Sequence, residues 1–487
     1  MSGRSNARLS AFIRRAMDAA SSPANVIVFA ADGRPAAHEI LVAMEERMHK
    51  TTERIESHVA MMQTRIHRFP RGLRGIGGED DRYIVPSVVA IGPYHHGLPH
   101  LQEMEEVKHA AAYDFCRVAG RSTKEVYEKV LSLAGDARYC YASDDEAVAR
   151  LSDAELAAML LLDGCFLLQY MASSDAPMFA GCNLSSGQAI LKDMMLLENQ
   201  IPWLVFDALI TEFLSVDVRQ FVTEIGDKFF PKEKQAPGWI TRFQMSLMMC
   251  RRRQPDPAER ETERHRGESV ISNGACKPPH LLGLLRSSQI QSMPRSDLLY
   301  HAGSSSLLSS SAVELAQIGV KLTSSPATWL GDMNLRKRLI FGELSLSPLF
   351  LNDVTACWLA NMAALEASTA ASWDSDGFVV SSYLSVIAML MDRKEDVHEL
   401  RSKGVLRSLF SNTQTLAFFK GLGRQLRLGG RYVVVLEQIE SYKRNRPVRI
   451  DAHRFIYKNY KIIAAVLSIA GVIIGIFKAL LALKTGN

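Results

Sequence analysis

The feature that most constrains this chain is an apolar stretch near its C-terminal end. Ile462–Phe477 is an unbroken run of apolar, small and hydroxyl-bearing residues, and Ala479–Leu483 continues it after Lys478. As an α-helix, residues 462–483 would match the roughly 20 residues that cross the hydrocarbon core of a bilayer. The sequence therefore predicts a membrane-spanning helix, with the preceding residues forming a large domain on one side of the membrane.

A buried core helix is the alternative interpretation of this stretch. Lys478 interrupts the apolar run, but a lysine near the end of a span can place its ammonium group among the lipid headgroups. The segment is also apolar on every face, whereas a surface helix carries a single apolar stripe. Membrane insertion is therefore the favoured interpretation.

Basic residues crowd the flank at 443–461, immediately before the predicted span. Clustered lysine and arginine side chains stay on the cytoplasmic side, and Tyr457 and Tyr460 lie where interfacial aromatic residues are common. We therefore expect a cytoplasmic N-terminal domain and a flank that attracts anionic lipid. The bases are Lys443, Arg444, Arg446, Arg449, Arg454, Lys458 and Lys461, and Asp451 is the acid among them.

Gly471 and Gly475 stand four residues apart within the predicted span. Small residues at this spacing allow two helices to approach closely, although the spacing is also common by chance. A homodimer formed through these two glycines is therefore one hypothesis.

Composition excludes some classes of protein. The 487 residues carry a formal net charge of +5, part of it in the basic flank, so nothing points to a nucleic-acid partner. The seven cysteines are scattered without a CxxC pair, which is typical of reduced thiols in the cytosol. With 47% hydrophobic and 22% charged residues, the chain has the composition of a folded globular protein.

Helical apolar spacing recurs along the chain, and the alternation of strands and helices that marks a parallel sheet is absent. We therefore predict a mainly α, multi-helical globular domain with a C-terminal transmembrane helix. Dense charge of both signs favours a linker or surface loop at 251–278. The predicted parts are a flexible leader at 1–37, a helical lobe at 38–250, the charged linker at 251–278, a second helical lobe at 279–442, the basic flank at 443–461 and the span at 462–483.

Individual elements carry sharper expectations. Tyr83–Ile91 is rich in β-branched residues and bounded by turns, which predicts an extended segment. Ile190–Val216 is predicted as a helix that Pro202 bends or splits. Apolar spacing predicts that Val354–Ser368 and Val397–Leu409 are helical throughout.

A seven-residue repeat marks the helix expected from His38 to about Ile66. Leu41, Met48 and Met62 belong to this repeat. Because the heptads are few, packing of this helix on its own domain is favoured over a coiled coil.

His95, His96 and His100 form the tightest histidine cluster, with Glu103 nearby. Adjacent histidines point apart in an extended chain, and no second cluster offers a fourth ligand. No metal site is therefore predicted, and these imidazoles are expected to cap helices or bond to backbone groups.

Asp163 lies inside a nearly all-apolar predicted helix, and Glu198, Asn199 and Gln200 form a second polar island before Pro202. A buried carboxylate needs an ion pair or hydrogen bonds, or its pKa rises. The favoured interpretation is a structural polar network that ties two central helices together and bonds backbone groups freed by Pro202. The alternative is a catalytic acid pair, since perturbed carboxyl groups also mark active sites.

Complete catalytic motifs are missing from the sequence. GxSxG, the phosphate-binding P-loop, HExxH and the protein-kinase signatures do not occur. We therefore predict no catalytic residues, no cofactor and no metal.

Four ordered blocks stand out: Phe69-Pro70 with Leu73-Arg74; Pro86 with Ile91–Gly97 and Glu105–Lys108; Leu162–Phe166; and Asp193–Trp203. Together they resemble the plant family called domain of unknown function 247, and the resemblance extends from about residue 66 to the end of the chain. The family's Pro-Trp before the terminal span is absent, and Tyr457–Tyr460 stands in its place. Weaker similarities surround His280, Arg286, Asn361, Glu366 and Asp396.

The resemblance implies a mostly helical protein with a C-terminal membrane span and no established enzymatic activity. Some members of the family are associated with self-incompatibility recognition in grass pollen. The leading hypothesis is therefore a membrane-anchored recognition or signalling protein without catalysis. It would present its loops at 251–278 and 287–311 to an unidentified protein partner, because loops on a rigid scaffold often carry binding specificity.

Two other classes of function stay open. One is an enzyme that uses Asp163 and Glu198 with His95 or His96, which requires these groups to converge on one solvent-reached pocket. The other is a membrane scaffold that dimerises through its glycine pair in the span.

Overall fold

The structure of the protein, a computed structural model, falls into two compact units, residues 1–61 and 62–487. The predicted leader at 1–37, residues 251–277 of the predicted linker and residues 295–309 of the loop predicted at 287–311 lie outside the described residues. The described residues are 41–42, 44–53, 65–74, 81–142, 145–172, 179, 187–230, 278–294, 310–326, 329–338, 341–369, 376–423 and 426–485.

In the first unit, residues 41–42 and 44–53 are helical, as the seven-residue repeat predicts. Leu41, Met44 and Met48 are exposed. The packing of this helix on its own domain stays a prediction.

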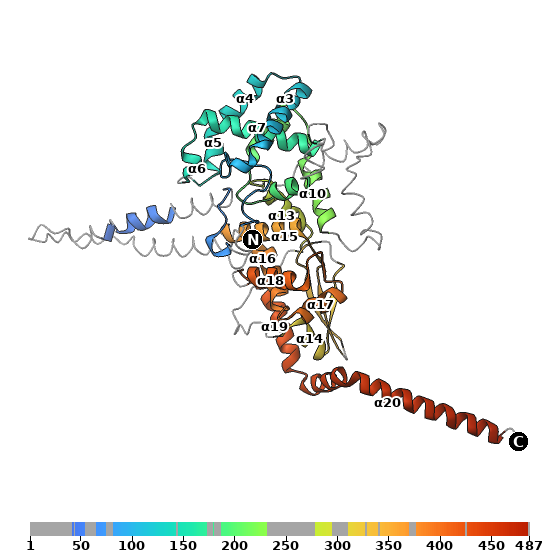
Figure 1. Ribbon diagram of the computed structural model, residues 1–487. Helices are drawn as coiled ribbons and strands as arrows, with labels where there is room; N and C mark the ends of the chain where they lie inside the picture. Colours follow the sequence, from blue (N-terminus) through green and yellow to red (C-terminus); the bar gives the residue numbers. More distant parts are fainter. Residues whose placement is uncertain are drawn as a thin grey trace, which may run out of the picture. The chain divides into compact units, whose positions relative to one another are not determined.

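Helices of the second unit first gather around α7 (Asp153–Ala172), which is apolar on nearly every face. A capping box of Ser152 and Glu155 starts this helix. Helices α3 and α4 pack along α7, and α5, α9 and α10 also contact it (Figure 1). The elements of this part are η1 (Arg71–Leu73), η2 (Pro99–Leu101), α3 (Glu103–Ala119), α4 (Thr123–Ser132), α5 (Ala134–Tyr139), α6 (Glu146–Ala149), α9 (Trp203–Glu212) and α10 (Val218–Phe229).

From residue 278 onward, the second part of this unit is centred on α15 (Asp353–Ser368), whose residues are almost all buried. Asn352 and Thr355 form a capping box at its start. α15 contacts α13, α16 and strand β4 (Leu349–Leu351). The remaining helices are α13 (Leu281–Ile290), α14 (Ala312–Gln317), η3 (Asp376–Phe378), α16 (Val379–Met389), α17 (Lys394–Ser402), α18 (Asn412–Gly423), α19 (Gly430–Arg444) and α20 (Pro447–Thr485).

One cluster of buried apolar side chains extends from Phe69 to Ile450. It includes residues on both sides of 251–278, because α10 packs on α13 and α13 packs on α15. The segments predicted as two helical lobes therefore share one core.

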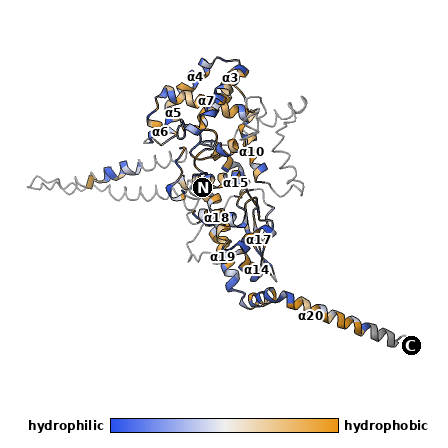
Figure 2. Ribbon diagram, viewed as in Figure 1, coloured by the Kyte–Doolittle hydropathy of each residue, from blue (hydrophilic) through white to orange (hydrophobic). Residues whose placement is uncertain are grey.

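Among the described residues, two helices are long and apolar enough to cross a membrane: α7 and residues 447–478 of α20. Within the most apolar 18-residue stretch of each helix, 78% of the residues are buried in α7 and none are buried in α20. Figure 2 shows hydrophobic residues along α20 beyond its first turns. α7 is thus a core helix, whereas α20 is the candidate membrane span, and the mainly α fold with a C-terminal apolar helix is confirmed.

Short strands in the second part were not predicted from the sequence. β1 (Val320–Ser324), β3 (Gly342–Leu346) and β2 (Met333–Lys337) form a sheet in that order, with β1 parallel and β2 antiparallel to β3. β4 pairs in parallel with β5 (Leu406–Ser408). Strands of three to five residues are too short to show a clear alternating pattern in the sequence.

The predicted helix Val397–Leu409 is wrong in its second half. α17 ends at Ser402, because Gly404 adopts a left-handed φ of 71° and its amide donates to the carbonyl of Arg401. The chain then reverses into β5.

Two other segments are less regular than predicted. Ile190–Val216 is split, as Pro202 suggested, but residues 194–202 are all non-helical and Pro202 is the residue before α9. Tyr83–Ile91 contains turns and bends and no strand. In both segments, side chains bond backbone groups that a helix or sheet would otherwise satisfy.

Candidate functional site

The candidate site is built around residues 86–97, the motif loop, which contains no helix or strand. Its buried amides need partners, and side chains from distant segments supply them. The Asp193 carboxylate accepts hydrogen bonds from the backbone amides of Ser87, Val88 and Val89 at 2.7–3.1 Å. Burial raises the pKa of Asp193, and the three amides oppose this effect.

Asn199 and Asp163 hold the next residues of the motif loop. The Asn199 side chain accepts from the Ile91 amide at 2.7 Å and donates to the Val89 carbonyl at 3.0 Å. The Asp163 carboxylate accepts from the Gly92 amide at 2.7 Å. These two polar side chains, from separate segments, thus meet at the motif loop.

Lys108 of α3 is the countercharge of Asp163. Its ammonium lies 2.7 Å from the Asp163 carboxylate, and both side chains are 1% exposed. Burial alone would lower the pKa of Lys108, but the carboxylates of Asp163 and Glu105 raise it above its ordinary value. Burial raises the pKa of Asp163, and Lys108 opposes this rise. The pair therefore joins α3 to α7 inside the core.

Gly92 allows the motif loop to lie against residues 194–202. It adopts a φ of 76°, and an added Cβ would be 2.4 Å from the Gln200 carbonyl oxygen. Glycine tolerates both the left-handed backbone and this close approach. The Tyr141 hydroxyl donates to the same carbonyl at 3.1 Å.

Gln200 connects residues 194–202 to the start of α13. Its side-chain nitrogen donates to the carbonyls of Met194 and Leu196 at 2.8 Å, and its oxygen accepts from the Leu282 amide at 3.2 Å. Backbone groups left without helical partners before Pro202 are therefore bonded by this side chain.

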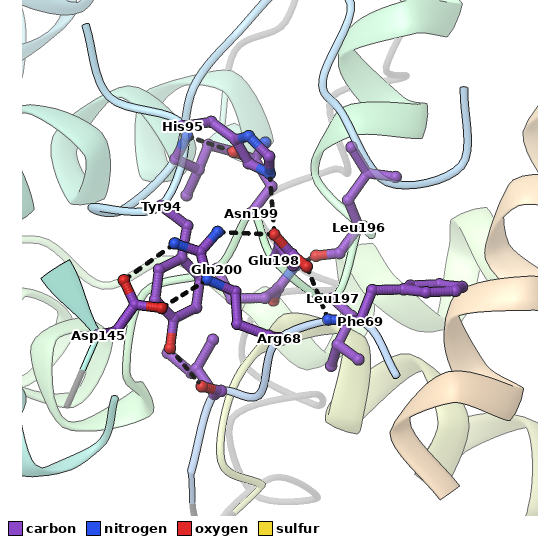
Figure 3. Close-up of polar contacts among 12 residues, drawn as sticks. Arg68, Phe69, Tyr94, His95, Asp145, Leu196, Leu197, Glu198, Asn199 and Gln200 are labelled. Atoms are coloured by element: carbon purple, nitrogen blue, oxygen red, sulfur yellow. Dashed lines mark hydrogen bonds and ion pairs between the residues drawn. The ribbon is translucent and has the colours of Figure 1, made fainter. Parts of the chain in front are cut away.

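Glu198 lies at the centre of a charged cluster that Figure 3 shows. Its carboxylate accepts from the Phe69 amide at 2.7 Å and pairs with Arg68 at 2.8 Å and Arg74 at 3.2 Å. The Glu198 side chain is 2% exposed. Two guanidinium groups and an amide thus offset the desolvation of this carboxylate.

Arg68 extends the cluster toward solvent. It makes two parallel hydrogen bonds to Asp145, at 2.7 and 2.9 Å, and its guanidinium lies 3.9 Å from the centre of the Tyr94 ring (Figure 3). The hydrogen bonds from Arg68 lower the pKa of Asp145. The Tyr94 hydroxyl donates to the Ile66 carbonyl at 2.9 Å.

The three histidines of the motif have different surroundings. His95 is buried 3.7 Å from Glu198, and burial lowers its pKa to about 4. His100 bonds to the Pro86 carbonyl at 3.1 Å. His96 faces a cavity, and its buried Nδ1 has no hydrogen-bond partner among the described residues. In the described part of the chain, no cluster of three or more His, Cys, Asp or Glu side chains could hold a metal ion.

A cavity of about 790 Å³ opens beside the motif loop. Arg68 and Asp145 form part of its wall, but Asp163 and Glu198 do not line it. Both acids are buried outside the wall of this cavity. The cavity is lined by Arg68, Tyr94, His96, Gly97, Leu98, Asp145, Glu146, Ala147, Arg150 and Leu151.

Polar side chains from the weaker sequence similarities also bond backbone groups elsewhere in the chain. Asn361 accepts from the Leu197 amide at 2.7 Å and donates to the Tyr83 carbonyl at 2.9 Å. Glu366 pairs with Arg286 at 2.8 Å and accepts amides at the start of α16. Asp396 and His280 bond the first turns of α14 and α13 respectively. These polar side chains hold irregular backbone rather than lining the cavity.

Sequence reasoning missed several partners of the predicted residues. Arg68 and Glu198 are 130 positions apart, and no local pattern links them. Lys108 and Asp193 both lie in the sequence blocks that carry the family resemblance. Their places in those blocks were the signal by which they could have been found. Asp145 carries no sequence signal that distinguishes it from other surface acids.

Gly471 and Gly475 both lie on α20, and no atom lies within 4 Å of a Cβ added at either position. Their predicted role in helix pairing therefore stays a prediction.

The chain was compared with known proteins. A family model described as "Plant protein of unknown function" (DUF247) matches residues 66–474. UPF0481 protein At3g47200 of Arabidopsis thaliana is 26% identical over 396 residues, which cover 74% of this chain and 71% of that protein. No solved structure matches the chain. Because the family model covers most of its length, the chain belongs to the DUF247 family of plant proteins of unknown function.

Proposed function

We propose that α20 anchors this protein in a membrane and that the body before it binds a protein partner without catalysing a reaction. The observation that carries the proposal is the uncovered apolar surface of α20. The most apolar 18-residue stretch of α20 has a mean hydropathy of 2.3, and none of that stretch is buried. Such a continuous apolar surface is unfavourable in water and favourable in hydrocarbon.

The basic first turns of α20 support a cytoplasmic position for the body. Arg449, Arg454, Lys458 and Lys461 precede the apolar stretch on the same helix, and lysine and arginine are enriched on the cytoplasmic side. Tyr457 and Tyr460 follow the pattern of residues at a membrane interface.

The cavity beside the motif loop is the proposed contact for the partner. Asn199 and Asp163 bond backbone amides of the motif loop, whereas Tyr94, His96 and Gly97 of the loop line the cavity. Exposed Glu146 and Arg150 stand beside apolar Leu98 and Leu151. Mixed charged and apolar surface of this kind suits a polypeptide partner.

Two observations support a binding role over catalysis. Asp163 is paired with Lys108, and Glu198 is paired with Arg68 and Arg74. Neither acid lines the cavity. Pollen recognition, which the resemblance implies for some family members, is one form that such a binding role would take.

Filling the cavity tests this proposal. Tagged full-length protein is isolated from native membranes as wild type, as Ala147→Arg and as Ala110→Arg, an exposed alanine on α3 outside the cavity. We expect co-purifying proteins to be lost with Ala147→Arg and kept with Ala110→Arg. If Ala147→Arg is membrane-bound and folded and keeps every co-purifying protein, the cavity is not the contact.

A further inference from the structure

The exposed face of the small sheet is strongly basic. Its opposite face is buried through Leu322, Leu335 and Leu344. On the exposed face, Lys321 of β1 and Arg336 of β2 are both register partners of Glu343 on β3. The basic sheet surface consists of the exposed side chains on this face, Lys321, Arg336 and Arg338.

Glu343 is the acid at the centre of the basic sheet surface, and Arg338 already pairs with it at 2.9 Å. One carboxylate therefore faces three cationic side chains. The excess positive charge favours an anionic partner.

The first residues of α20, and those just before it, contact the sheet beside this surface. Arg446 donates to the Arg338 carbonyl at 2.9 Å, and the ring of Tyr442 lies against Gly342 of β3. Gly319, directly before β1, has a φ of 81°, and a Cβ added there would be 2.9 Å from the His453 ring. α14 also packs on α20 (Figure 1). The sheet and the start of the candidate span are therefore held together.

From these contacts we infer that the basic sheet surface binds the anionic headgroups of the membrane in which α20 is anchored. The inference rests on the proposed anchoring. It adds a second contact, made by the folded body and separate from the basic flank of α20. The ligand class is an anionic phospholipid surface.

Distances along α20 show when this contact forms. Arg446 and Ile462 are separated by about 24 Å of helix at 1.5 Å per residue, of which the headgroup layer fills roughly 5–8 Å. An upright helix would hold the sheet farther from the headgroups than the screening length of about 8 Å at physiological salt. Because the sheet lies beside the helix, a tilt toward it closes this gap. Anionic lipid therefore favours a tilted, membrane-contacting body, and neutral lipid does not.

Lipid crosslinking tests the inference on the full-length protein. The protein is reconstituted in phosphatidylcholine vesicles with or without phosphatidylserine, each containing a trace of lipid with a photoreactive headgroup, and adducts are mapped by mass spectrometry. We expect adducts on α20 in both membranes and adducts on residues 321–338 only with phosphatidylserine. Salt near 1 M, which shortens the screening length to about 3 Å, should remove the second set.

Variants separate charge from folding. Arg336→Gln with Lys321→Gln should lower the adducts on residues 321–338 by about fivefold for each base removed. Arg336→Gln alone tests a single strand. The matched control, Arg121→Gln with Lys124→Gln, removes two exposed bases beside and on α4 and should change nothing.

Two results would overturn the inference. Equal adducts on residues 321–338 in neutral and anionic membranes, with α20 labelled in both, would reject the sheet contact and keep the anchor. Absence of adducts on α20 would reject the anchor and the sheet contact together.

Discussion

Lys108 and Asp163 illustrate how single residues support the fold. Both side chains are almost fully buried, and the carboxylate also holds the Gly92 amide. Removing one charge of such a pair leaves the other buried without compensation, whereas removing both charges costs less. The contribution of this pair therefore depends on both partners being present.

Lys108→Met should lower the free energy of unfolding by about 3–5 kcal/mol. Lys108→Met combined with Asp163→Asn should recover part of this loss, because the oxygen of the introduced carboxamide can still accept the Gly92 amide. Chemical denaturation of the detergent-solubilised full-length protein measures both. Lys124→Met, on the exposed face of α4, serves as the control. A loss no larger than that of Lys124→Met would show that the buried pair contributes nothing.

Burial lowers the pKa of His95 to about 4, below the ordinary value of 6.5. The unfolded chain therefore binds this proton at a higher pH than the folded chain does. The stability that His95 contributes is complete above about pH 6.5 and is lost as the pH falls toward 4, by about 3 kcal/mol in total. His280, whose pKa burial lowers to about 3, adds a change of the same sign.

Unfolding free energies of wild type and His95→Gln, measured from about pH 7 down to about pH 4, check this dependence. We expect the wild-type curve to fall more steeply than that of the variant. Parallel curves would mean that His95 has the same pKa in the folded and unfolded chains.

Among the elements, α7 and α20 show what apolar composition can and cannot predict. Both are long and apolar, and only burial distinguishes the core helix from the candidate span. The sequence still indicated that α7 is central, because the helix is nearly all apolar apart from Asp163 and Gly164. In the structure, Asp163 pairs with Lys108, and a Cβ on Gly164 would be 2.6 Å from Leu209 of α9.

Other elements depend on contacts that local patterns do not encode. The short strands β1 to β3 are stabilised by partners up to about twenty residues away, and their sequences carry no long alternation. Tyr83–Ile91, which overlaps the motif loop, was predicted as an extended segment because it is rich in β-branched residues. The amides of the motif loop instead bond to Asp193, Asn199 and Asp163, and residues 71 to 108 positions apart cannot be paired from one sequence.

The motif loop yields a prediction with an internal control. Gly92 and Gly97 both have left-handed φ angles, of 76° and 82°, but only a Cβ on Gly92 would clash, with the Gln200 carbonyl. Gly97→Ala should therefore cost only the backbone strain of about 1–2 kcal/mol. Gly92→Ala should cost more, because the motif loop must also move away from residues 194–202.

Thermal unfolding of the two glycine variants, followed in the same detergent, ranks their stabilities. An equal fall in melting temperature would show that the loop yields without resistance at Gly92. In that case the contacts of Asp163 and Asn199 would not fix its position.

At the scale of the whole molecule, one buried core carries a long helix whose apolar surface it does not cover. α20 is 39 residues long, and its basic first turns precede the apolar ones. The root of the helix is bonded to the sheet, so the body and the candidate span are mechanically joined. Anchoring in a membrane is the claim on which the proposed partner contact and the lipid contact both depend.

Extraction of native membranes with alkaline carbonate tests this claim most directly. We expect the full-length protein to stay in the membrane pellet. A variant with Ile469→Lys and Ile473→Lys should move to the supernatant, because lysine at the centre of a span costs about 2.5–3.5 kcal/mol per residue. Release of the wild-type protein into the supernatant would show that α20 is not a membrane anchor.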